Sequence, residues 1–88
     1  MTKSRPRIPY GKIRTVAEIG ALVRRRRMED GVYQSEAAGL AGVGTRFLSE
    51  LERGKETAEI GKVLRVMERL GLVVWVAPRG ISPGSCDG

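Results

Sequence analysis

Residues 33–53 read YQSEAAGLAGVGTRFLSELER, two short helical patterns separated by glycines. Its first part, residues 34–41, is rich in alanine and predicts a short helix with small, closely packing faces. Glycines break the pattern just before residue 45, which indicates a turn. A second helix follows over residues 45–52, with Leu48 and Leu51 on its inward side and a glycine just past its end. The stretch therefore predicts a helix-turn-helix.

The second helix of this unit carries polar side chains on its outer faces. In a helix-turn-helix the second helix enters the major groove of DNA, where base edges present a distinct pattern of donors and acceptors. Arg46 is the strongest candidate for a base contact, because a guanidinium bonds both acceptors of guanine. Thr45 either touches a thymine methyl or donates to an acceptor, and Glu50 either accepts from cytosine or repels phosphate. We expect four base contacts, each with the alternative of an ordinary exposed side chain: Thr45, Arg46, Ser49 and Glu50.

The segments on either side predict two more helices. One runs from an N-cap at Thr15 to Arg27 and ends at the following Glu-Asp-Gly. The other runs from a cap at Thr57 to a terminating Gly71. Their apolar residues recur at helical spacing and are expected in the core: Ile19, Leu22 and Val23 in the former, and Ile60, Val63, Leu64, Met67 and Leu70 in the latter.

A different pattern follows the last helix, because residues 72–77 read LVVWVA and predict one β-strand. A lone strand has no partner inside a helical domain, and the same strand of a second copy would supply one. We therefore expect an all-α domain of four to five helices whose single short C-terminal strand pairs across a two-fold dimer. The residues expected in that pairing are Leu72, Val74, Trp75 and Val76.

Positive charge is concentrated at the start of the chain. The net charge is +6, and the first 14 residues hold five basic residues and no acid. Such an arm suits a polyanion, and Lys3, Arg5 and Arg7 are expected to reach the minor groove or the backbone of DNA. The alternatives are a solvated tail or an arm that binds nucleic acid without specificity. The expected boundaries are a basic arm at 1–14, a DNA-binding domain at 15–71, a dimerisation strand at 72–78 and a disordered tail at 79–88.

The composition argues against catalysis. The chain has no histidine, a single cysteine (Cys86) and no phosphate-cradling glycine loop, and its acids lie beside arginines as in surface pairs. We expect no catalytic residue, no metal, no cofactor and no enzymatic activity. No apolar stretch is long enough to span a bilayer, and no signal core follows the basic start, so we expect no membrane partner and a cytoplasmic location.

Several short motifs lie in the order and spacing of a known family. They are IG at 19–20, VRRRR at 23–27, QSEAA at 34–38, AGV at 41–43 and LSELERG at 48–54. Over residues 16–71 the chain resembles the lambda-repressor-like (Xre-type) helix-turn-helix, whose pattern is Thr-Gln-x-Glu-Leu-Ala, Ala-Gly-Val and Ser-x-Leu-Glu-x-Gly.

This resemblance implies roles for individual residues. Gln34 is expected to bond a phosphate with the helix N-terminus behind it. Arg27 is expected to form a partly buried, structural ion pair with Glu52. Further phosphate contacts are expected from Arg24, Arg53 and Lys55. Three positions depart from the family pattern: Tyr33 replaces a threonine, Ala37 replaces a leucine and Gly44 replaces a capping residue.

Residues 45–58, together with the last helix leading directly into a strand, are similar to HipB-type antitoxins. That similarity implies a bacterial, nucleoid-associated homodimer that binds a palindromic operator, represses its own operon and neutralises a HipA-type serine/threonine kinase toxin. Two alternatives stay open. In the first, the chain would be a stand-alone Xre-type regulator with no toxin partner. In the second, it would be mainly a protein-interaction module.

Overall fold

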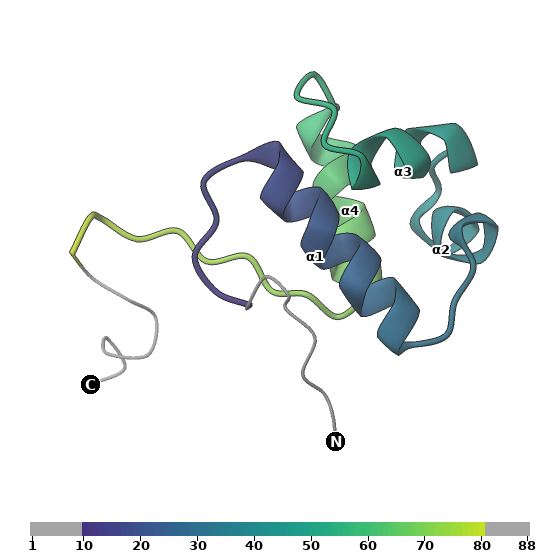
Figure 1. Cartoon of the computed structure of the whole chain (residues 1–88), viewed down its shortest axis with the longest axis horizontal. Coiled ribbons are helices and arrows are strands. Elements are labelled where there is room, and N and C mark those ends of the chain that lie inside the picture. Colours follow the sequence, from purple (N-terminus) through teal and green to yellow (C-terminus); the bar gives the residue numbers. More distant parts are fainter. Residues whose placement is uncertain (1–9, 81–88) are drawn as a thin grey trace.

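A computed structural model describes residues 10–80 of the chain (Figure 1). Four α-helices occupy these residues: α1 (Val16–Glu29), α2 (Gln34–Ala41), α3 (Thr45–Glu52) and α4 (Ile60–Arg69). The prediction of an all-α domain is confirmed, and α2 and α3 have the predicted bounds. None of the helices in this part of the chain is both long and apolar enough to cross a membrane.

The start of α1 is fixed by a reciprocal pair of hydrogen bonds. The Thr15 hydroxyl accepts from the Glu18 amide at 3.1 Å, and the Glu18 carboxylate accepts from the Thr15 amide at 3.2 Å. This capping box satisfies two amides that have no partner within the helix. Thr15 is therefore the N-cap that the sequence predicts.

Helix α4 begins later than predicted. Thr57 lies in the preceding loop, and Glu59 is the N-cap. The Ala58 amide donates to the Lys55 carbonyl at 3.3 Å, so the chain is still in a tight turn where the sequence predicts the first helical residues.

The buried face of α4 also differs from the predicted stripe. Val63, Met67 and Leu70 are buried as predicted, and Val66 completes the face with 1% of its surface exposed. Ile60 is 64% exposed and Leu64 is 44% exposed, so these two predicted core residues are wrong. They lie to one side of the buried face, because the helix turns about 100° per residue.

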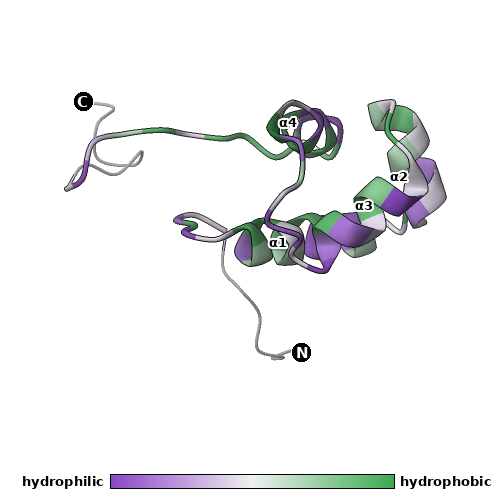
Figure 2. Ribbon diagram, turned by 90° about the horizontal axis from the view of Figure 1, so that it is seen from above, coloured by the Kyte–Doolittle hydropathy of each residue, from purple (hydrophilic) through white to green (hydrophobic). Residues whose placement is uncertain are grey.

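Helices α1 and α3 cross at very close range. A Cβ atom on Gly20 of α1 would lie 2.0 Å from the carbonyl oxygen of Leu51 on α3, so only glycine fits there. The core beside this crossing contains the largest fully buried side chains: Val23, Leu48, Leu51 and Val66. In Figure 2, where α4 is seen nearly end-on, α1 and α2 lie on different sides of it, with α3 between them.

Residues 72–78 form no strand within the described chain. They extend away from α2 and α3 in both views (Figures 1 and 2). Val73 is 89% exposed and Val76 is 90% exposed. A strand needs a second strand to bond with, and a single copy offers none to this segment. Pairing across a dimer therefore stays a prediction.

Candidate nucleic-acid interface

The turn between α2 and α3 is built around a left-handed glycine. Gly42 has φ 71° and ends α2. Its amide donates to the Gly39 carbonyl at 3.2 Å, and the Val43 amide donates to the Ala38 carbonyl at 3.0 Å. This pair of bonds is a Schellman-type ending, which satisfies the last carbonyls of the helix and reverses the chain sharply. Helix α3 is thereby set against α2 after only three residues.

Helix α3 is divided into a buried side and an outer side. Leu48 and Leu51 have 0% of their surface exposed. Phe47 is half-buried against the core, and the Lys62 ammonium lies 5.7 Å from the centre of its ring. The four residues predicted to contact bases lie outside this buried pair: Thr45 and Arg46 are exposed, and Ser49 and Glu50 are half-buried.

A network of three charged side chains lies along the outer side of α3. The Glu50 carboxylate accepts from Arg46 Nε at 3.3 Å through one oxygen and from Lys55 Nζ at 3.0 Å through the other. The pKa of Glu50 is lowered, first by the hydrogen bond from Lys55 and then by the one from Arg46. Glu50 is therefore charged at neutral pH and pairs with two predicted DNA contacts.

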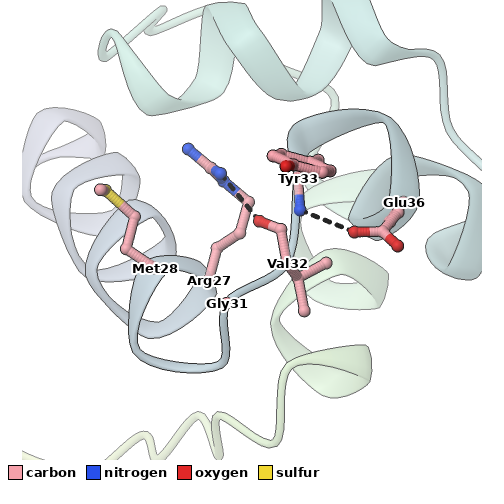
Figure 3. A pocket seen from close by; sticks show the side chains of 6 residues that line it. All are labelled: Arg27, Met28, Gly31, Val32, Tyr33 and Glu36. Carbon is pink, nitrogen blue, oxygen red and sulfur yellow. Dashed lines mark hydrogen bonds between the residues drawn. The ribbon is translucent and has the colours of Figure 1, made fainter.

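A second network lies where α1, α2 and α3 meet. Arg27 donates from Nε to Glu52 at 2.7 Å and from a terminal nitrogen to the other Glu52 oxygen at 2.9 Å. Its remaining nitrogen donates to the Val32 carbonyl at 2.9 Å (Figure 3). Only 12% of the Arg27 side chain and 3% of the Glu52 side chain are exposed. The Glu52 hydrogen bond raises the pKa of Arg27.

Gln34 joins this network from the first turn of α2. Its amide nitrogen donates to Glu52 Oε1 at 3.0 Å. The structure thus brings together three residues whose roles came from the family resemblance, namely Gln34, Arg27 and Glu52. One amide hydrogen of Gln34 is used by Glu52, which leaves its second hydrogen for a ligand.

The α1–α2 loop bounds a shallow hollow next to this network (Figure 3). Tyr33 is the N-cap position of α2, and its side chain makes no capping hydrogen bond. Instead the Glu36 carboxylate accepts from the Tyr33 amide at 2.9 Å. The hydrogen bond at the start of α2 is therefore still made with tyrosine at position 33, where the family pattern has threonine. The tyrosine side chain is mostly exposed.

The four consecutive arginines of α1 have four different surroundings. Arg24 is exposed, and its side chain makes no hydrogen bond or ion pair in the described part of the chain. Arg25 pairs with Glu29 at 3.1 Å. Arg26 Nε donates to the Leu70 carbonyl at 3.0 Å, at the end of α4. Arg53, another predicted phosphate contact, is also exposed, and its side chain makes no hydrogen bond or ion pair among residues 10–80.

Tyr10, the first residue that the structure describes, contacts the C-terminal end of α1. Its hydroxyl donates to Glu29 at 3.0 Å, and the Arg25 guanidinium lies 4.0 Å from the centre of its ring. Burial and then the Glu29 hydrogen bond raise the pKa of Tyr10. This contact could not be predicted from the sequence, because residues 10 and 29 carry no local signal that would pair them. The predicted arm contacts Lys3, Arg5 and Arg7 lie outside the described residues.

Comparison with known proteins identifies the family. The chain is 52% identical over 69 residues to the uncharacterized helix-turn-helix-type transcriptional regulator y4mF of Sinorhizobium fredii. The aligned region covers 78% of this chain and 91% of that protein. The chain belongs to the helix-turn-helix transcriptional regulators. No family model matches this regulator.

Solved structures show that the regulator has the fold of HipB. One is a complex of a HipB variant with the O2 20-mer, with a TM-score of 0.73, 17% identity, and coverage of 81% of this chain and 99% of that chain. Another is a complex of HipA, HipB, O2 and O3, with a TM-score of 0.72, 18% identity, and coverage of 80% and 99%. At such identities the likeness concerns the fold.

Proposed function

We propose that this regulator is a sequence-specific repressor that inserts α3 into the major groove of duplex DNA. The observation that carries the proposal is the division of α3. Leu48 and Leu51 are completely buried, whereas the Arg46 side chain is 90% exposed in the first turn. In a helix-turn-helix, the N-terminal residues of the second helix contact base edges. The side chains that face the base edges in this proposal are Thr45, Arg46, Ser49 and Glu50.

The phosphate contacts in this proposal surround that helix. Gln34 lies in the first turn of α2, where the helix dipole favours an anion, and its orientation is held by Glu52. Arg53 and Lys55 follow α3 directly, and Arg24 is exposed on α1. Cations at these positions supply affinity that depends on salt, while the side chains of α3 supply sequence preference.

The basic arm adds to the electrostatic part of the interface. Lys3, Arg5 and Arg7 are proposed to follow the adjacent minor groove or the backbone, because arginine is favoured in narrow A·T tracts. Alanine at these three positions should reduce the slope of log affinity against log salt by about 1 for each phosphate that the arm neutralises. An unchanged slope would rule out binding of phosphates by the arm.

A two-fold dimer through residues 72–78 would suit a palindromic operator. Support comes from the exposed apolar side chains of this segment, including Trp75 at 53%, and from its direction away from α2 and α3. Pairing there would bury apolar surface and satisfy free backbone groups, and it would leave both copies of α3 accessible.

For a protein partner, we propose a HipA-type serine/threonine kinase toxin, which the regulator would neutralise while repressing its own operon. The HipB fold of the chain supports this, since HipB is solved in a complex with HipA. The second candidate is a stand-alone regulator without a toxin; the 52% identity to the transcriptional regulator y4mF fits either candidate. Co-expression with a kinase-like protein encoded beside the regulator distinguishes the two, because only the antitoxin would co-purify and restore growth.

The repressor proposal is tested by selection from a pool of random duplexes with the full-length protein. We expect enrichment of one motif arranged as an inverted repeat, which the protein binds more tightly than a scrambled duplex. A pool that stays random after several rounds would contradict sequence-specific binding and leave only electrostatic attraction.

A further inference from the structure

We propose that Glu50 is a positioning residue for Arg46: its carboxylate holds the guanidinium so that the two terminal nitrogens form an outward fork for guanine. The inference rests on the proposed binding of α3 in the major groove, and it concerns how that helix gains its base preference. It assigns to Glu50 a function through Arg46, in place of a base contact of its own.

Glu50 is held in a fixed position by the loop that follows α3. The Lys55 amide donates to the Glu50 carbonyl at 3.1 Å, and Lys55 Nζ donates to the Glu50 carboxylate at 3.0 Å. The loop after α3 therefore holds Glu50 at both its backbone and its side chain. With 24% of its side chain exposed, Glu50 is far less accessible than Arg46 at 90%.

Glu50 binds one particular nitrogen of Arg46. The two residues are one helical turn apart, and the contact is made by Nε at 3.3 Å. The terminal nitrogens of Arg46 have no hydrogen-bond partner in the described part of the chain. Because a guanidinium is planar, a bond at Nε orients the fork formed by these two nitrogens. That fork matches the N7 and O6 acceptors of guanine.

The same contact affects the choice between specific and competing DNA. An arginine that is held in place loses less side-chain freedom when it binds a base. A carboxylate 3.3 Å from the same guanidinium also repels phosphate, so it disfavours contacts of Arg46 with the backbone of random duplex. Both effects raise the ratio of specific to non-specific affinity.

The experiment compares full-length variants on the duplex selected by the wild-type protein and on single-base variants of it. Arg46→Ala identifies the base pair that Arg46 reads, and wild type should prefer that pair about tenfold. We expect Glu50→Ala to reduce this preference to about threefold or less and to bind random duplex more tightly than wild type. Glu50→Gln, which keeps an acceptor for Nε, should retain part of the preference.

Glu56→Ala is the matched control, because it removes the same charge just after α3 from a side chain with no hydrogen bond or ion pair among residues 10–80. It should keep the full base preference. In the Arg46→Ala background, Glu50→Ala should change no base preference further. Circular dichroism verifies that each variant is folded.

Two results would overturn the inference while leaving sequence-specific binding intact. One is a guanine preference that survives Glu50→Ala. The other is a preference that disappears at a different base pair, which would make Glu50 a reader of cytosine. A wild-type protein with no base preference at any position would instead overturn the proposed function, and this inference with it.

Discussion

Glu52 connects α3 to both α1 and α2 through hydrogen bonds of its carboxylate. Only 3% of its side chain is exposed, and it accepts hydrogen bonds from both Arg27 and Gln34. Glu52→Ala would leave the buried Arg27 charge unpaired, so we expect the free energy of unfolding to fall by about 3–5 kcal/mol. Urea denaturation measures the decrease.

The exposed pair of Glu59 and Lys62, 3.6 Å apart, provides the control for Glu52. Glu59→Ala should cost less than about 1 kcal/mol, because solvent screens exposed pairs. Equal decreases in the free energy of unfolding of the two variants would show that the Arg27–Glu52 pair stabilises the fold no more than a surface ion pair does.

Tyr10 makes the stability of the chain depend on pH. The hydrogen bond from its hydroxyl lowers the pKa of Glu29 more than any other contact does, and the bond from Arg25 comes second. A carboxyl whose pKa is lower in the folded state stabilises the fold above its unfolded pKa, and this contribution is lost as the pH falls through the folded value.

Tyr10→Phe should therefore melt at a lower temperature than wild type at about pH 7, and the difference should shrink below about pH 4. Thermal melts followed by circular dichroism at several pH values measure it. A difference that is independent of pH would mean that the hydroxyl does not stabilise the charged form of Glu29.

The four arginines of α1 show which residue roles a sequence cannot supply. In the sequence they are equivalent, and the family resemblance singled out only Arg24 and Arg27. Arg25 and Arg26 have local partners one turn away, Glu29 and Asp30. What distinguishes Arg25, Arg26 and Arg27 are tertiary contacts with residues distant in the chain, which are Tyr10, Leu70 and Glu52 respectively. The link from Glu50 to Arg46 spans one helical turn, and its spacing is visible in the sequence.

At the scale of helices, the crossing of α1 and α3 depends on Gly20. Alanine there would place its Cβ 2.0 Å from the Leu51 carbonyl oxygen, so the two backbones must separate. We expect Gly20→Ala to destabilise the fold by about 3 kcal/mol or more. Since α3 is one of the two helices that must separate, binding to the selected duplex should weaken as well.

Gly39 is the matched position for this test. It lies inside α2, and a Cβ there would meet nothing within 4 Å. Gly39→Ala should stabilise the fold by up to about 1 kcal/mol, since alanine is the better helix former. Chemical denaturation of the two variants should give changes of opposite sign, and the same sign for both would contradict the close crossing.

The elements that could be predicted are those with local signals. The glycines around Val43 and after Glu52 mark the ends of α2 and α3, and the prediction of both helices is confirmed. The start of α4 was missed because Thr57 resembles a cap, whereas the turn between Lys55 and Ala58 delays the helix. Periodicity identified α4 as amphipathic, but the buried face is set by the helices that pack against it.

At the scale of the whole molecule, residues 72–78 are proposed to join two copies. Trp75→Asp would place a charge in the paired strands, so we expect a protein that is mainly monomeric by light scattering. Arg79→Asp, just beyond the segment, should leave the dimer intact. A Trp75→Asp protein that stays dimeric would refute this role of the segment.

Recognition of base sequence by α3 can be measured with a gel-shift titration of the full-length protein. The probe is the DNA upstream of the gene that encodes this chain, with random duplex as competitor, at two salt concentrations. We predict that wild type forms a complex that survives excess competitor at both, and that Arg46→Ala loses this advantage. A wild-type complex displaced equally well by any duplex, and weakened by salt to the same degree on all of them, would rule out sequence recognition by α3.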